Sequence, residues 1–111
     1  MKKGEVWRVR FPSVPGRTQA GARPAVIIHN EPFLTSLPVA LVVPFTSQLA
    51  AGRFPGTLTV QPDGSNGLSV TSIALVFQLG AQDKRNFVSR LGTLDAATLD
   101  TILDIARQLV L

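Results

Sequence analysis

Arginine, hydroxyl and amide side chains lie where loops meet two apolar segments, and this combination suits a phosphodiester. Gln19 and Arg23 end a long segment that contains Gly and Pro, and Thr46 and Ser47 follow an apolar run. Pro24 biases Arg23 toward extended backbone geometry, which would hold it at the rim of a sheet. A guanidinium binds phosphate oxygens bidentately and, beside a hydroxyl, stabilises negative charge as it develops.

The same residues also have a purely structural interpretation. Arg23 would then pair with a surface carboxylate, and Thr46 would simply end a strand. The catalytic interpretation requires the two apolar segments to be neighbouring strands, because Arg23 and Thr46 can then face one cleft.

Several other chemistries lack the residues that they need. The chain has no Cys, which excludes disulfides, thiolate metal sites and Cys nucleophiles. Its single histidine, His29, ends a buried type of strand, which favours a structural role over catalysis. Neither metal-ligand spacings nor the glycine patterns of nucleotide-binding loops occur. The sequence therefore predicts neither a metal nor a cofactor.

Length and charge favour one small domain with a polyanionic partner. The chain has 111 residues, which predicts a single domain over residues 1–111. The formal net charge is +4, with net +5 in residues 1–60 and net −1 in the remainder. An excess confined to one half indicates a site for a polyanion, first of all nucleic acid, or else a solvated basic face.

The chain carries no apolar stretch that resembles a signal peptide or a membrane span. The absence of Cys fits a reducing compartment. We therefore expect a soluble, cytoplasmic protein with no membrane partner.

Short strands broken by Gly/Pro turns must position the polar residues. Glu5 to Phe11 alternates with period 2, so that Val6, Arg8 and Arg10 face one way. The further strands are expected at 25–28, 39–43 (ended by Pro44), 57–60, 72–79 and, as an edge strand, 88–91, with loops at 12–22 and 46–56 and a turn at 61–67.

From Leu94 the period changes to that of a helix. Apolar residues from Leu99 to Val110 recur at helical spacing, and Asp95 stands where an N-cap is expected. The elements together predict a small, mostly antiparallel β-domain closed by one C-terminal amphipathic helix.

Ordered motifs along the whole chain support a more specific assignment. The chain resembles the MazF/PemK family of toxin ribonucleases from bacterial toxin–antitoxin pairs. The matching segments are Gly4–Val9, Gln19–Ile27 (the Q-x-G-x-R-P-x-x-V motif), Val43–Ser47 (the strand ending in P-x-T), Gly67-Leu68, Ser72, Gln78, Asp83–Arg85 and Leu91–Leu94.

The resemblance implies both a fold and an activity. The fold is a small SH3-like barrel or PemK-type antiparallel sheet with a C-terminal helix. The activity is metal-independent cleavage of single-stranded RNA, usually mRNA, at short specific sequences, by a homodimer. The 2′-hydroxyl attacks the adjacent phosphorus and leaves a cyclic phosphate and a 5′-hydroxyl. The implied partner is an antitoxin whose acidic, disordered tail folds over the toxin.

The resemblance also assigns roles by position. Arg23 would be the principal catalytic residue, as an acid or as the group that stabilises the phosphorane, and Thr46 its partner at the scissile phosphate. Gln19 and Ser47 would orient the RNA, and Gln78 would contact a base or support the cleft. Arg17 and Thr18, in the same loop as Gln19, are also assigned to RNA binding.

Two positions depart from the family pattern. Thr18 and Phe77 stand where many relatives carry an acidic residue. We therefore expect Arg23 and Thr46 to supply most of the transition-state stabilisation, with deprotonation by another group or by water. Phe77 would pack in the core or stack on a base, and Trp7 would be a core or dimer contact or a base platform.

Two alternatives differ in function class. One is a non-catalytic toxin of the CcdB type that binds a topoisomerase through the same fold. The other is an RNA-binding module that has lost cleavage, which the missing acidic residues would favour.

Overall fold

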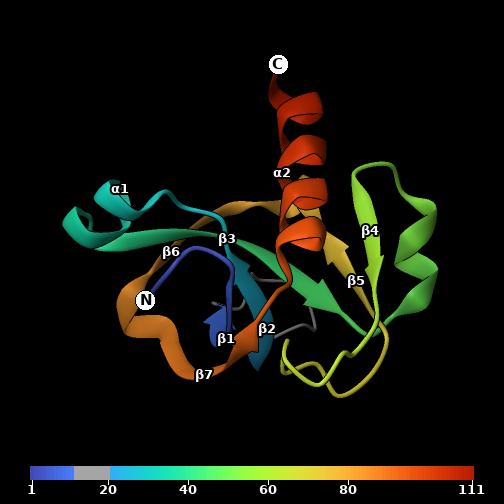
Figure 1. Cartoon of the computed structure of the whole chain (residues 1–111), viewed down its shortest axis with the longest axis horizontal. Helices are drawn as coiled ribbons and strands as arrows, with labels where there is room; N and C mark the ends of the chain where they lie inside the picture. The colour runs from blue at the N-terminus through green and yellow to red at the C-terminus, as the bar shows by residue number, and fades with distance from the viewer. Residues whose placement is uncertain (12–20) are drawn as a thin grey trace.

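A computed structural model describes residues 1–11 and 21–111. The described residues form a seven-stranded antiparallel sheet with a long C-terminal helix above it (Figure 1). The strands are β1 (Glu5–Phe11), β2 (Gly21–Ile27), β3 (Val39–Thr46), β4 (Thr57–Val60), β5 (Ser72–Leu75), β6 (Gly80–Asp83) and β7 (Phe87–Thr93). The helices are α1 (Glu31–Ser36), α2 (Ala96–Val110) and the 3-10 helices η1 (Leu49–Arg53), η2 (Val76–Gln78) and η3 (Lys84–Asn86).

The strand order is β4-β5-β3-β2-β1-β7, with β6 also paired to β3. The sheet is open, since β4 and β7 form no ladder with each other among the described residues. The expected mainly β fold with a C-terminal helix is confirmed, although the sheet does not close into a barrel. None of the helices in the described ranges is long and apolar enough to cross a membrane.

Two clusters of buried side chains hold the sheet, and the alternation of β1 contributes to both. Val6 belongs to the core beneath α2, together with Ile102 of that helix. Val9 belongs to a second core, which Leu34 of α1 completes and which Trp7 flanks. The period-2 pattern expected for β1 is therefore confirmed, and Trp7 is a packing residue.

The strand β3 continues through Pro44, where the sequence predicted its end. Along one edge β3 pairs first with β6, up to Val42, and then with β5, from Phe45 onward. Val43 and Pro44 fall between these two ladders, so a residue without an amide N–H is accommodated there.

One further strand prediction is wrong, and one short helix was not predicted. The strand expected at 72–79 ends at Leu75, and η2 turns the chain before β6 begins. The short helix α1 was not predicted, because six residues are too few for a helical period to emerge. The loop expected at 12–22 lies outside the described residues except for Gly21 and Ala22, which belong to β2.

The C-terminal helix begins where its capping signal predicts. The Asp95 carboxylate accepts hydrogen bonds from the Thr98 amide at 3.0 Å and the Thr98 hydroxyl at 2.6 Å. The first of these bonds caps a free backbone amide at the start of α2, and the apolar face of the helix covers the core beneath it.

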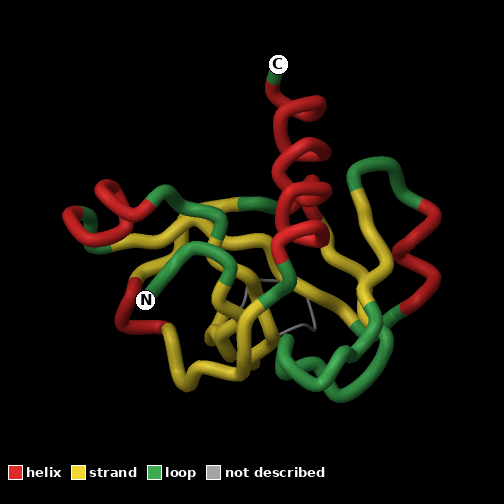
Figure 2. The backbone as a smooth tube through the Cα atoms, viewed as in Figure 1, coloured by secondary structure: helices red, strands yellow, loops and turns green. Residues whose placement is uncertain are grey.

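A long loop between β4 and β5 packs against the backbone of β7 and is seen below β4 in Figure 2. Gly67 has a φ of +74°, and a Cβ placed there would meet the backbone of Leu91. A Cβ on Gly92 would in turn meet the carbonyl oxygen of Ser65. The loop and β7 thus approach closely enough to exclude side chains at both glycines.

We predict that Gly92→Ala destabilises the fold by about 1–3 kcal/mol, since rigid backbone stands where the methyl group must go. Gly80→Ala is the matched control, because its Cβ would meet only the Gln78 carbonyl oxygen at 3.8 Å. Urea unfolding measures both variants. Equal stability of the two would contradict the close approach of the loop to β7.

Candidate active site

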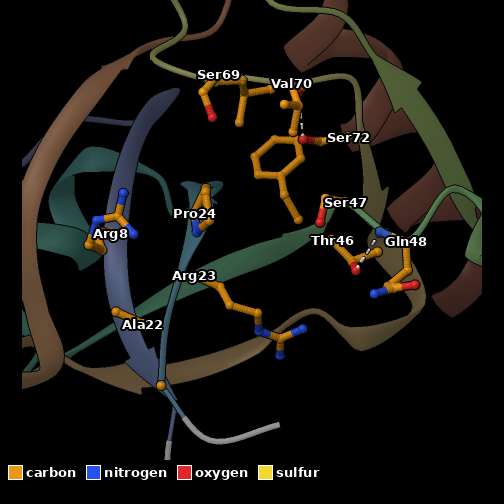
Figure 3. A pocket seen from close by; sticks show the side chains of 13 residues that line it. Arg8, Ala22, Arg23, Pro24, Thr46, Ser47, Gln48, Ser69, Val70 and Ser72 are labelled. Atoms are coloured by element: carbon orange, nitrogen blue, oxygen red, sulfur yellow. Dashed lines mark hydrogen bonds between the residues drawn. The ribbon is translucent and has the colours of Figure 1, made fainter.

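One cavity of about 470 Å³ opens where the ends of β2 and β3 face the loop before β5 (Figure 3). Its lining includes several of the polar residues that the sequence singled out. The lining residues are Arg8, Gly21, Ala22, Arg23, Pro24, Phe45, Thr46, Ser47, Gln48, Leu68, Ser69, Val70 and Ser72.

The ladder between β2 and β3 leads the ends of both strands, with Arg23 and Thr46, to one cavity. The ladder pairs Ile27 with Val42 and Ala25 with Pro44, and it ends there. Arg23 and Thr46 each lie two residues beyond the last pair, where the cavity opens. The condition set by the sequence, that the two apolar strands be neighbours, is therefore met, and both residues line one cavity.

The Arg23 side chain is partly buried and rests on an aromatic ring. Its guanidinium carbon lies 5.0 Å from the centroid of the Phe11 ring, a cation–π distance. Burial lowers the pKa of the Arg23 guanidinium, yet an arginine stays protonated in proteins. Arg23 is thus a permanent cation in a partly desolvated position.

The Thr46 hydroxyl is oriented by a local turn. Its oxygen accepts a hydrogen bond from the Gln48 amide at 3.1 Å. A hydroxyl has one donor and two acceptor sites. Since the backbone takes an acceptor site, the O–H remains able to donate to a ligand oxygen.

The opposite wall comes from the loop before β5 and depends on the buried residue Asn66. The side-chain nitrogen of Asn66 donates to the Gln61 carbonyl oxygen at 2.9 Å, and its side-chain oxygen accepts from the backbone amide of Leu68 at 3.0 Å. The loop that follows carries Ser69 into the cavity lining.

The cavity lining is basic and rich in hydroxyl groups, and among the described residues it includes no Asp or Glu. Arg23, Thr46 and Ser47 were predicted as site residues, and the other polar lining residues were not. These residues are Arg8, Gln48, Ser69 and Ser72, of which Ser72 was named only as part of the family motif. Arg8 had one usable signal, a basic residue two positions after a buried valine on a strand. Ser69 depends on how a distant loop packs, and Ser72 on how β5 pairs with β3.

Several residues singled out earlier lie elsewhere. Gln78 is on η2 and does not line the cavity. The neighbouring Phe77 is exposed rather than in the core, with its ring centroid 5.9 Å from that of Phe54. The predictions for Arg17, Thr18 and Gln19 lie outside the described residues.

His29 has a structural environment. It is buried, its Nδ1 faces the Leu41 amide at 3.4 Å, and its ring stacks on Phe33. It does not line the cavity. Within residues 1–11 and 21–111, His, Asp and Glu side chains form no group of three or more that could hold a metal.

Residues 2–110 match the family model described as PemK-like, MazF-like toxin of type II toxin–antitoxin system. The chain belongs to this family. It is therefore a MazF-type toxin, as its ordered motifs implied.

Curated relatives of this toxin are endoribonucleases. It is 27% identical over 102 residues to endoribonuclease EndoA of Bacillus subtilis, covering 92% of this chain and 87% of that one. It is 26% identical over 109 residues to endoribonuclease MazF of Staphylococcus epidermidis, covering 96% and 90%.

Solved structures share the fold of the toxin. MazF from Deinococcus radiodurans superposes with a TM-score of 0.80 at 22% identity, covering 99% of this chain and 96% of that one. A mycobacterial endoribonuclease in complex with its cognate antitoxin gives a TM-score of 0.75 at 20% identity, covering 99% and 94%.

We predict that Asn66→Ala destabilises the toxin by about 1–3 kcal/mol, because it leaves the amide of the buried Leu68 and the carbonyl oxygen of Gln61 without these hydrogen bonds. Ser65→Ala, on the exposed neighbour, should change stability by less than about 0.5 kcal/mol. Urea unfolding compares the two. Similar stability of both variants would exclude Asn66 as the residue that holds this wall.

Proposed function

We propose that this toxin is a metal-independent, sequence-specific endoribonuclease that cleaves single-stranded RNA, chiefly mRNA, with residues 1–111 acting as one domain. The observation that carries the proposal is the presence of Arg23 and Thr46 in one cavity, to which residues 1–11 and 21–111 contribute no carboxylate. Such a lining favours a phosphate over a cation or an acidic substrate group. Family membership and the endoribonuclease relatives support the same activity.

The proposed step is an internal transfer at phosphorus. The 2′-oxygen forms a bond to the adjacent phosphorus while the bond to the 5′-oxygen breaks, which yields a cyclic phosphate and a 5′-hydroxyl. Water takes the proton from the 2′-hydroxyl, and a solvent molecule donates a proton to the departing 5′-oxygen, so that no net proton is gained or lost. Arg23 stabilises the charge on the phosphorane, and Thr46 donates to one of its oxygens.

Partial burial makes Arg23 effective in this role. In a partly desolvated position the attraction between the guanidinium and the developing charge is weakly screened. The Phe11 ring holds the group before substrate arrives, so little reorganisation is needed during the reaction. Ser47 lines the same cavity and would orient the RNA together with Gln19, Arg17 and Thr18.

The decisive experiment incubates the purified protein with mixed single-stranded RNA in EDTA and maps the ends of the products. We expect cleavage at a short recurrent sequence, with cyclic phosphate and 5′-hydroxyl ends. RNA that stays intact across diverse substrates would exclude the nuclease and leave a topoisomerase-binding toxin or a non-cleaving RNA-binding module.

We predict that Arg23→Ala lowers the cleavage rate by at least about 10²-fold while the protein stays folded. Arg53→Ala is the matched control. The Arg53 guanidinium also rests on a phenylalanine ring, at 4.9 Å, but lies outside the cavity. Rates are measured in single-turnover cleavage, and folding by circular dichroism. Near-normal cleavage by Arg23→Ala would exclude the assignment.

We propose that the protein acts in the cytoplasm and is neutralised there by a cognate antitoxin with an acidic, disordered tail. The basic bias of residues 1–60 suits an acidic segment as well as RNA. One structural neighbour is itself in complex with its cognate antitoxin.

We further propose that the protein is a homodimer. Phe54, Phe77 and Leu109 have exposed fractions of 45%, 41% and 46%. They are neighbours, since Phe54 and Phe77 are in edge contact and a Cβ on Gly56 would touch both Phe77 and Leu109. A contiguous exposed apolar surface of this kind is typical of an interface between subunits.

We predict that Phe77→Asp converts the dimer to a folded monomer, because a carboxylate on this surface would be buried without a partner. Val88→Asp is the control, since Val88 is 49% exposed on the separate strand β7. Analytical ultracentrifugation measures the mass of each variant. A Phe77→Asp protein that remains dimeric would place the interface elsewhere.

A further inference from the structure

Arg8 reaches the cavity through the alternation of β1. Val6 packs in the core beneath α2, and Arg8 is the next residue on the same face of β1. It pairs in register with Pro24 of β2, and both residues line the cavity. In Figure 3 Arg8 lies on one side of the cavity, and Ser47 and Ser72 lie on the other.

The charge of Arg8 is available to a ligand. Arg8 is exposed, and no carboxylate pairs with it in the described parts of the chain. Arg85, Arg90 and Arg107, which pair with carboxylates, lie outside the cavity.

Arg8 and Arg23 leave the sheet in different directions. Arg23 pairs in register with Val9, and Arg8 pairs with Pro24. Because successive residues of a strand point to opposite faces, the two arginine stems start on opposite faces of the β1–β2 pair. This separation lets each guanidinium bind a phosphate of its own.

We propose that Arg8 is a positioning residue that binds a second phosphate of the RNA strand, next to the one at Arg23 and Thr46. The inference rests on the proposed cleavage of single-stranded RNA. Arg8 is exposed, so it contributes to binding the strand before and during the reaction to a similar extent. Its loss then raises KM and leaves kcat near the wild-type value.

The direct test measures the affinity for a mixed-sequence, 2′-O-methyl oligoribonucleotide, which cannot undergo 2′-hydroxyl attack, at several salt concentrations. A phosphate contact to a single strand contributes about 0.7 to the slope of log affinity against log salt. We predict that Arg8→Gln weakens binding about tenfold and lowers this slope by about 0.7.

Arg10→Gln is the matched control for charge. Arg10 lies on the same face of the same strand, is exposed and does not line the cavity, so its removal should leave the slope unchanged. Arg8→Lys should restore part of the slope, because a lysine keeps the charge and loses the bidentate geometry.

Cleavage kinetics provide the second readout. For Arg8→Gln we expect about a tenfold higher KM with kcat within about twofold of wild type. For Arg8→Gln, a salt slope equal to that of wild type or a loss confined to kcat would overturn the proposal. The same binding assay with an acidic peptide in place of RNA gives the third outcome, since a loss of affinity for the peptide alone would also overturn it. A wild-type protein that binds the oligonucleotide but cleaves no RNA would refute the proposed function and leave the Arg8 contact intact.

Discussion

The antiparallel register between β2 and β3 is the constraint on which both the core and the cavity depend. It buries Val26 beside Val43 in the core beneath α2. The same ladder leads Arg23 and Thr46, each two residues beyond its last pair, to the wall of one cavity. A slip by one residue would move every side chain of β2 to the other face. Burial of the apolar residues therefore fixes the position of the polar residues.

The pairing of Arg23 with Thr46 in one site was predictable from the sequence, because it required only that two apolar strands be neighbours. Arg23 precedes one buried apolar run, and Thr46 follows another. Adjacency of the two strands was then enough to join them. Ser69 and Ser72 were not predictable in this way. Ser69 lies in a loop that packs closely on β7, where Gly67 and Gly92 leave no room for side chains. Ser72 begins β5, and the pairing of β5 with the end of β3 brings it to the cavity.

The errors in the strand prediction have a common physical origin. Hydrophobic periodicity reports burial but not the partner of a strand. The run from Ser72 to Leu79 is mostly apolar, yet the chain pairs with the far end of β3 first and, after η2, with its beginning. Pro44 caused the opposite error, a strand predicted too short. Its missing N–H falls where β3 changes partners, so the strand continues.

The two cavity arginines stand in different dielectric surroundings, and this difference separates their roles. Arg23 is partly buried against Phe11, so a charge that develops beside it is weakly screened. Arg8 is exposed to solvent, where attraction to a phosphate is strongly screened and depends on salt. A group in the first setting can favour the transition state over the bound substrate, whereas a group in the second stabilises both alike. The sheet thus provides a binding contact and a catalytic contact from adjacent strands, with the same side-chain type.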